Sequence, residues 1–258
     1  MISDLGVACF HISPPNSNTA QTYWVLFELM AASLKRVAPQ TKLHLLTNSY
    51  TNVPKGLSCD NKFINESGKD REDYFKYLMF EELDCWYNYF EKGANLQNTI
   101  LVDIDILFQR DPSVLFDNKF DIGLTYNNDP SLHSFNAGVI LVDSHRHYAI
   151  DKYFGNLLNH IKTYEIDQQQ WYGDQQAMAE VLGEYSFEKC YPKVFDKTCD
   201  KIRYRFLPVD TWNYSFPLDS KNKPIYTVNR EAGIIHFKGE RKGFMTRYAS
   251  EVLDIEVG

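Results

Sequence analysis

The sequence predicts an α/β domain of three layers, in which helices cover both faces of a mainly parallel sheet. Three observations support this prediction. Short apolar runs alternate along the chain with longer segments whose apolar residues recur at helical spacing. The segment 99–108, TILVDIDILF, is apolar on both faces in its first half, as is typical of a central strand covered on each side. The chain has 258 residues, which is enough to bury a substantial core.

The first half of the chain is expected to supply two strands and two helices before this central strand. Strands are expected at 5–10 and 43–47. Between them, the segment 22–37 has an apolar stripe that stops before Pro39, so a helix is predicted there. A second helix is predicted over 72–90, because acidic Glu72 and Asp73 favour a helix N-terminus.

The second half of the chain continues this alternation. Strands are expected at 121–125, 137–142 and 232–237. Helices are expected at 148–163 and from Asp174, a candidate N-cap, to Gly183. In a sheet of this kind, ligands bind beyond the carboxyl ends of the strands. We therefore expect functional residues where apolar strands give way to polar loops.

Charge and composition argue against several classes of protein. With 27 basic and 34 acidic residues the formal charge is −7, so the chain lacks the broad basic surface of a nucleic-acid-binding protein or of a polybasic membrane anchor. No apolar run reaches the roughly 18 residues of a spanning helix, and the N-terminal segment does not resemble a signal peptide. The five cysteines are scattered, without a metal-binding or disulfide spacing. A cytoplasmic location is therefore predicted, and peripheral contact with a membrane stays open.

The clearest chemical feature is a pair of aspartates at the end of the central strand. Asp103 and Asp105 are two residues apart, so in an extended strand both carboxylates point to the same side and can bind one cation. Two hard oxygen ligands suit Mg²⁺ or Mn²⁺. In the alternative interpretation, one aspartate caps the next turn and the other is solvated. The D-x-D pattern is too common by chance to decide between these alone.

Two further segments carry polar groups suited to a sugar. In 135–143, Asn136 and two small residues precede an apolar strand. Its amide offers both a donor and an acceptor to a hydroxyl-rich molecule, and small residues let a ligand approach the backbone. In 173–176, Gly-Asp-Gln-Gln, an acid and an amide begin a helix, although Asp174 can also be explained as a simple cap.

A third segment, 234–242, combines a histidine with positive charge. An apolar strand ends at His236, and Gly239 allows a tight turn after it. The basic residues nearby are Lys238, Arg241 and Lys242. An imidazole completes a Mn²⁺ site, and a lysine after the turn can neutralise a diphosphate.

In this order, D-x-D, F-N-A-G-V, D-Q and H-x-x-G-x-x-K resemble the motifs of the GT-A glycosyltransferases of family 8, which include galactosyl- and glucosyltransferases and glycogenin. The similarity extends over about residues 73–243. It implies a GT-A fold, a Rossmann-like three-layer sandwich with a mixed, mainly parallel central sheet. It also implies metal-dependent transfer of a hexose from a nucleotide-diphosphate sugar, with a UDP-sugar favoured, to a glycan or other hydroxyl acceptor, with retention of configuration.

The resemblance assigns roles to the metal and diphosphate residues. Asp103, Asp105 and His236 match the family's ligands for Mn²⁺, a site that Mg²⁺ can also occupy, and Asp103 also belongs to the donor site. Gly239 and Lys242 match its diphosphate contacts.

The resemblance also assigns the donor-sugar residues. Asn136, Ala137, Asp174 and Gln175 match the residues that hold the sugar, with Gln175 nearest the reacting carbon and Asp174 beside it. Lys76 lies where the family usually has an arginine that touches the donor; lysine keeps the charge but loses the planar fork.

The sequence departs from the family in two places. The segment from His11 to Asn18 does not match the loop that reads the base, and Gly243 and Phe244 follow Lys242 where the family has Pro-Trp. Other classes of function remain. An inverting GT-A enzyme of a neighbouring family would use a carboxylate as base, and a metal-dependent nucleotidyltransferase would need a Gly-rich basic loop, which 11–22 lacks. A sugar-binding module would have no use for this metal and diphosphate group.

A single GT-A domain is expected over 1–258. Its donor-binding core is predicted at about 1–183 plus 230–243, with acceptor-side and C-terminal elements at about 184–229 and 244–258. The aromatic residues within 196–230 can form either an acceptor platform or core, and core is favoured.

Overall fold

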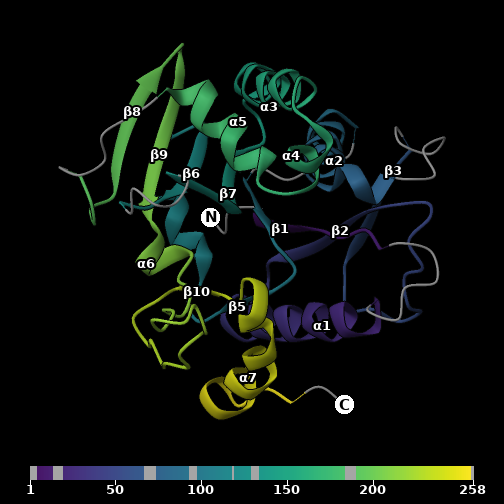
Figure 1. The fold of residues 1–258 in the computed structure, drawn as a ribbon, viewed down its shortest axis with the longest axis vertical. Helices are drawn as coiled ribbons and strands as arrows, with labels where there is room; N and C mark the ends of the chain where they lie inside the picture. Colours follow the sequence, from purple (N-terminus) through teal and green to yellow (C-terminus); the bar gives the residue numbers. More distant parts are fainter. Residues whose placement is uncertain are drawn as a thin grey trace.

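The structure is a computed structural model that describes residues 5–13, 20–66, 74–92, 98–117, 119–128, 134–183 and 190–256. Within them an eight-stranded mixed sheet crosses the molecule in the order β3-β2-β1-β4-β7-β6-β9-β8 (Figure 1). Its strands are β1 (Leu5–Phe10), β2 (Lys42–Asn48), β3 (Asn61–Asn65), β4 (Asn98–Val102), β6 (Ile122–Tyr126), β7 (Phe135–Asp143), β8 (Phe195–Cys199) and β9 (Ile202–Pro208).

The direction of the strands changes at the middle of the sheet. Strands β3, β2, β1 and β4 are parallel to one another, whereas β7 runs antiparallel to both β4 and β6. Beyond it, β6 and β9 are parallel and β8 is antiparallel to β9. The sheet is therefore mixed and mainly parallel, as the sequence predicts.

Helices cover both faces of the sheet, which confirms the three layers (Figure 1). One face carries α1 (Ala20–Val37) and α7 (Met245–Leu253), together with a two-stranded ribbon of β5 (Ile106–Phe108) and β10 (Ile234–His236). The other face carries α2 (Leu78–Lys92), α3 (His147–Ile161), the short α4 (Ile166–Gln170) and α5 (Gly173–Leu182). Shorter turns are η1 (Tyr74–Tyr77), η2 (Pro112–Phe116), α6 (Val209–Trp212) and η3 (Gly239–Phe244). Among the described residues, no helix is both long and apolar enough to cross a membrane.

The central strand β4 explains the run of apolar residues in the sequence. Ile100 and Val102 belong to the core beneath α1 and α7, whereas Leu101 between them belongs to the core beneath α2, α3 and α5. All three side chains are fully buried. Alternate residues of one strand thus fill two cores, which is why neither face of this strand is polar.

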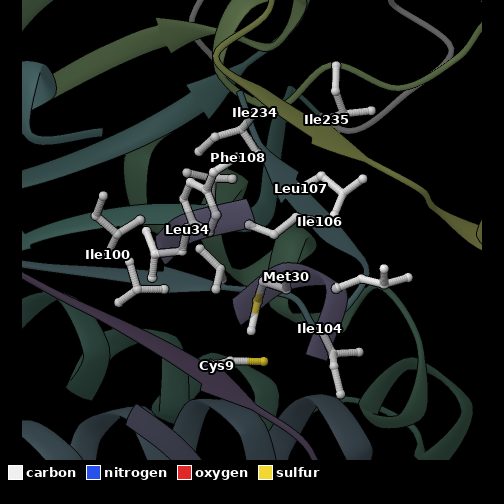
Figure 2. Close-up of a cluster of buried hydrophobic side chains, with 14 of the residues drawn as sticks. Cys9, Met30, Leu34, Ile100, Ile104, Ile106, Leu107, Phe108, Ile234 and Ile235 are labelled. Carbon is white, nitrogen blue, oxygen red and sulfur yellow. The ribbon is translucent and has the colours of Figure 1, made fainter. Parts of the chain in front are cut away.

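The predicted strand 99–108 is wrong in its second half. The extended sheet strand ends at Val102, residues 103–105 form a turn, and β5 leaves the sheet to pair antiparallel with β10. Figure 2 shows the core under this ribbon, where Met30 and Leu34 of α1 lie among the apolar side chains of β5 and β10. The Phe108 amide also donates to Ser33 Oγ at 3.0 Å, which ties the ribbon to α1.

Most other predicted elements agree with the structure to within a few residues, but two groups differ. The predicted helix 72–90 consists of η1 followed by α2, and its expected first residues, Glu72 and Asp73, lie outside the described residues. Strands β3, β8 and β9 were not predicted. β3 and β8 are edge strands with mainly exposed or half-buried side chains, so they lack the apolar pattern of a buried strand.

Three aromatic residues of the segment 196–230 belong to the core. Tyr204, Trp212 and Phe216 are buried, which confirms the favoured interpretation of this segment. This packing leaves no room for a side chain at position 233, because a Cβ atom on Gly233 would lie 2.3 Å from the Trp212 ring.

Candidate active site

The turn after β4 holds the two aspartates in place through its backbone. The Asp103 amide donates to the Gly138 carbonyl of β7 at 3.2 Å, and the Asp105 carbonyl accepts from the Phe237 amide at 2.8 Å. Asp103 and Asp105 therefore converge because a turn is fixed between β7 and the end of β10. The predicted reason, an extended strand with both side chains on one side, was wrong, although the predicted convergence is present.

The side chains of Asp103, Asp105 and His236 form a compact group. The Nε2 atom of His236 lies 3.1 Å from Asp103 Oδ2 and 3.1 Å from Asp105 Oδ1. One potential ligand atom from each residue lies within 4.8 Å of the others. A proton or a cation must lie between this nitrogen and the carboxylates, and two carboxylates with one imidazole are suitable ligands for Mn²⁺ or Mg²⁺.

The group is closed on one side and open on the other. Asp105 and His236 are 4% and 3% exposed, whereas the Asp103 side chain is 34% exposed. A cation bound here would be held by the buried pair and would reach solvent, or a ligand, beside Asp103. Such a geometry leaves coordination positions free for phosphate oxygens.

Two lysines bring positive charge to the same place. Lys242 Nζ lies 2.7 Å from Asp105 Oδ2. Burial acts to raise the pKa of Asp105, but His236 and Lys242 outweigh it and hold that pKa below its ordinary value. Burial lowers the pKa of Lys238 to about 8, against the opposing charges of Asp103 and Asp105. Gly239, which begins η3 with φ +57°, makes the turn that brings Lys242 back toward Asp105.

A buried asparagine orients the histidine. Asn213 is 1% exposed, and its Nδ2 atom donates to Thr125 Oγ1 at 2.8 Å and to Asn136 Oδ1 at 2.6 Å. Its Oδ1 atom, 2.8 Å from His236 Nδ1, is therefore the acceptor of the imidazole N–H. That hydrogen bond leaves the lone pair of His236 Nε2 directed toward the two aspartates, as a metal ligand requires.

The hydrogen-bonded chain continues to the predicted sugar residues. Asn136 Nδ2 donates to Gln175 Oε1 at 3.1 Å, and Asn136 Oδ1 also accepts from the Gly138 amide at 3.2 Å. Residues from β7, α5, the loop after α6 and β10 are thus connected within one polar network. The sequence motifs identify Asn136 and Gln175 but not Asn213, which lies outside every motif.

Gly138 is required by the close approach of β7 to the metal group. A Cβ atom at this position would lie 2.3 Å from His236 Cε1 and 2.8 Å from Asp103 Oδ2. Neither neighbour can move without changing the ligand geometry. The small residues of the F-N-A-G-V motif therefore include one that makes room for the protein's own ligands.

Helix α5 begins one residue before its predicted cap. Its N-cap is Tyr172, in the left-handed region at φ 63°, and Asp174 lies in the first turn, so the predicted N-cap at Asp174 was wrong. Asp174 is 2% exposed, and its Oδ1 atom has no hydrogen-bond partner among the described residues. Burial raises the pKa of Asp174 to about 7, with a smaller contribution from Asp103.

Three solved structures that are similar in fold to this chain are glycosyltransferases. No family model and no curated protein matches the chain. The bifunctional glycosyltransferase WbbM matches over 97% of this chain and 50% of its own length, with a TM-score of 0.59 and 12% identity. The galactosyltransferase LgtC, in complex with donor and acceptor sugar analogs, matches over 97% of both chains, with a TM-score of 0.53 and 12% identity.

A third solved structure of similar fold is also a glycosyltransferase. The glycosyltransferase GlyE of Streptococcus pneumoniae matches over 96% of this chain and 60% of its own, with a TM-score of 0.50 and 13% identity. The chain has a glycosyltransferase fold. At these identities the likeness extends to the fold, and this chain spans only half the length of WbbM.

Of the predicted donor-site residues, Ala137 is buried and Lys76 is exposed. The Ala137 side chain is buried in the core beneath α2, α3 and α5, so only its backbone can meet a ligand. Lys76 is exposed on η1, before α2 begins. The acid Glu82, one turn into α2, is buried instead, and the charges of Asp103, Asp174 and Asp105 add to burial in raising its pKa.

The carboxyl end of β1 adds a group that no motif identifies. His11 is 8% exposed, its ring is stacked on Tyr23 at a centroid distance of 5.0 Å, and its Nε2 atom has no hydrogen-bond partner among the described residues. Burial acts to lower the pKa of Lys242, but Asp105 outweighs it and raises that pKa, with a smaller contribution from Tyr23. The remainder of the unmatched segment, 14–18, lies outside the described residues.

Proposed function

We propose that this chain is a metal-dependent glycosyltransferase that transfers a hexose from a nucleotide-diphosphate sugar to a hydroxyl group of a glycan or another acceptor. A UDP-sugar is the favoured donor. We also propose that the chain is related to the glycosyltransferases of family 8. The observation that supports this most strongly is the convergence of Asp103, Asp105 and His236 beside Lys242, at the end of the central strands.

The proposed reaction breaks the bond between the anomeric carbon and the diphosphate oxygen and forms a bond from that carbon to the acceptor oxygen, whose proton passes to the departing diphosphate. A bound Mn²⁺ or Mg²⁺ supplies positive charge that stabilises the departing diphosphate. Lys242 is proposed to leave Asp105 and bind a phosphate oxygen when the donor arrives. Gly239 opens the turn that lets Lys242 and neighbouring amides reach the diphosphate.

The sugar is proposed to lie between the metal group and the start of α5. Asn136 and the Ala137 backbone would hold its hydroxyls, and Lys76 remains a proposed donor contact from η1. Gln175, which is fixed by Asn136, would lie nearest the reacting carbon. The negative charge of Asp174 would stabilise an oxocarbenium-like carbon.

Retention of configuration is part of the proposal, and inversion is a second candidate because of one observation. Asp174 has a pKa of about 7 and an oxygen without a partner among the described residues, which are properties of a general base. The anomeric configuration of the product, determined by NMR, separates the two reactions.

The test of the proposed function is a panel of UDP-, GDP-, CMP- and dTDP-sugars with Mn²⁺. We expect one donor to be hydrolysed slowly, and to raise the melting temperature, only in the absence of EDTA. Asp103→Ala provides the matched inactive protein. If no donor gives a metal-dependent response, the chain has this fold without the proposed activity.

The rest of the proposal concerns the acceptor and the place of action. Residues at about 184–229 and 244–258 are proposed to form the acceptor side of a single domain that spans 1–258, and the enzyme is proposed to act in the cytoplasm.

A further inference from the structure

Two large aromatic side chains are exposed at the corner between α4 and α5. Trp171 is 57% exposed and Tyr172 is 65% exposed, which are the two highest values among the large hydrophobic residues that the structure describes. The other three tryptophans of the chain, Trp24, Trp86 and Trp212, are buried. Neighbouring exposed rings of this size forgo the free energy of burial, and apolar surfaces of this kind are often binding sites.

The backbone of the corner is closely constrained. The Trp171 amide donates to the Asp167 carbonyl at 3.1 Å. The chain then passes close to α4, since a Cβ atom on Gly173 would lie 2.2 Å from the Gln168 carbonyl oxygen. Between them Tyr172 adopts the left-handed conformation at φ 63°, which is uncommon for a residue other than glycine and is found most often at functional sites. The two rings thus extend from a fixed corner, so that a ligand need order little further chain.

This corner lies beside the proposed donor site. Tyr172 is the N-cap of α5, whose first turn contains Asp174 and Gln175, and Cα atoms two residues apart lie within about 7 Å of each other. The Gln175 side chain is bonded to Asn136 at 3.1 Å, which ties this end of α5 to the polar network of the metal group. On its other side, α4 packs against η1, which carries Lys76. A molecule bound to the rings therefore lies within reach of the place proposed for the reacting carbon.

We propose that Trp171 and Tyr172 form an acceptor subsite, in which they stack on a pyranose ring of the acceptor. This proposal rests on the proposed function, and among the possible hydroxyl acceptors it selects a glycan. The subsite adds to the acceptor-side elements proposed at about 184–229 and 244–258.

The chemistry of the corner favours a sugar over a peptide. One face of a pyranose carries C–H groups that pack on an aromatic ring, while the hydroxyls around its edge need hydrogen-bond partners. The half-buried amide of Gln170, next to Trp171, offers both a donor and an acceptor to those hydroxyls. An extended peptide gains much of its affinity from main-chain hydrogen bonds to a sheet edge, whereas this corner lies between two helices.

The experiment measures binding of candidate acceptors to the full chain in the presence of Mn²⁺ and either UDP or GDP. The sugar probes are maltose, cellobiose, lactose and melibiose, and a serine-rich peptide is the non-sugar probe. Saturation-transfer NMR identifies the ligand protons that contact the protein, and titration gives the affinity. For the wild-type protein we expect at least one disaccharide to bind, with the strongest transfer to the C–H protons of one ring face.

Trp171→Ala removes one ring of the subsite. We expect the affinity for that disaccharide to fall by at least about tenfold, and Trp171→Phe, which keeps a ring, to recover most of it. Tyr148→Ala is the matched control and should bind like the wild type, because Tyr148 is 55% exposed but lies on α3, at the opposite end of the sheet. There Asp143 of β7 pairs with Asn98, the first residue of β4, whereas the metal turn follows Val102, its last. Circular dichroism melting establishes that all three variants are folded.

The outcomes separate the two proposals. If a nucleoside diphosphate binds with Mn²⁺ but no disaccharide binds, if only the peptide binds, or if folded Trp171→Ala keeps the wild-type affinity, the acceptor subsite is overturned and the proposed function is left intact. If no nucleoside diphosphate binds with Mn²⁺, the proposed function fails, and the acceptor role that rests on it fails too.

Discussion

Lys242 Nζ lies 2.7 Å from Oδ2 of Asp105, while the other oxygen of the same carboxylate, Oδ1, lies 3.1 Å from His236 Nε2. One buried acid is thus shared between a lysine and a histidine. In a protein without metal, the lysine neutralises part of the charge that a divalent cation would otherwise neutralise. Lysine and metal therefore compete for Asp105, although both favour a bound diphosphate.

Lys242→Ala should raise the affinity for Mn²⁺ and lower the affinity for the nucleoside diphosphate. We expect tighter binding of Mn²⁺ alone, because the competing ammonium is gone, and about tenfold weaker binding of the nucleoside diphosphate with Mn²⁺. Calorimetric titration measures both, with exposed Lys221→Ala as the control. If diphosphate affinity is unchanged, Lys238 rather than Lys242 is the basic residue that binds the diphosphate. Arg241 is a poorer candidate, because its Nε already donates to the Phe216 carbonyl at 2.6 Å.

The two aspartates should differ in their effect on stability. Asp103→Ala and Asp105→Ala are both expected to reduce transfer by at least about a hundredfold, since each removes a metal ligand. Asp103 is partly exposed, so its loss should leave the melting temperature nearly unchanged. Loss of buried Asp105 should lower it, because Lys242 and His236 lose their partner. Near-wild-type turnover in either variant would remove the metal-site assignment.

Gly138→Ala tests the close approach of β7. The new methyl group would lie 2.3 Å from His236 Cε1 and must displace the ring. We expect the Mn²⁺-dependent rise in melting temperature to disappear. Gly155→Ala in α3 is the control, since nothing lies within 4 Å of its Cβ position, and it should stabilise the helix by up to about 1 kcal/mol. A Gly138→Ala variant with normal Mn²⁺ affinity would disprove the steric argument.

Asn213→Ala tests the orientation of the histidine. Without the acceptor at 2.8 Å, the His236 ring loses the bond that sets its tautomer, and Mn²⁺ affinity should fall by about 10- to 100-fold. Thr125→Val removes the 2.8 Å acceptor behind Asn213 Nδ2 and the 2.9 Å hydrogen bond that Thr125 Oγ1 donates to the Asn136 carbonyl, but it leaves the bond to His236 in place, so a smaller loss is expected. Electron paramagnetic resonance of free Mn²⁺ measures both affinities. Equal affinities in the wild type and Asn213→Ala would show that His236 is held by other contacts.

Asp174 should make the metal-free protein less stable as pH rises. Its pKa is raised from an ordinary 3.8 to about 7 in the folded state, so the folded protein binds the proton more tightly than the unfolded chain does. The resulting stability is fully present below about pH 4 and is lost between about pH 4 and 7, by at most about 4 kcal/mol.

Asp174→Asn should remove this pH dependence. At pH 8 with EDTA, the variant is therefore expected to melt at a higher temperature than the wild type while transferring sugar poorly, since a stabilising change at a functional site often costs activity. Denaturant unfolding at several pH values provides the measurement. A lower free energy of unfolding than the wild type at pH 8 would show that the Asp174 carboxylate is stabilised in the folded protein.

The parts of the fold that could be predicted are those whose residues carry a local pattern. The central strand β4 was recognisable because Ile100, Leu101 and Val102 fill cores on both faces. Strand β8 could not be recognised, because its middle residues are exposed and its partner is chosen by contacts made elsewhere in the chain. Local residue patterns identify a buried strand better than an edge strand.

The same limit applies to the candidate site. Asp103, Asp105 and His236 were predicted and lie together, although the turn that unites the aspartates was not expected. Asn213 acts through one side chain in a segment without a motif, and Glu82 lies on a helix whose pattern indicates only burial. A sequence shows what chemistry a residue can perform, whereas the approach of distant segments decides whether it does so.

The pairing of β5 with β10 determines when the metal group can form during folding. Asp105 and His236 are 131 positions apart along the chain (236 − 105 = 131), so a growing polypeptide contains both aspartates long before it contains the histidine. Until β10 pairs with β5, the acids repel one another without a counter-ion. A cation that binds all three residues favours the finished state over every partly assembled one, by an amount that increases with its free concentration. For the proposed enzyme, the supply of this metal would then control how much protein matures, as well as how fast the mature protein works.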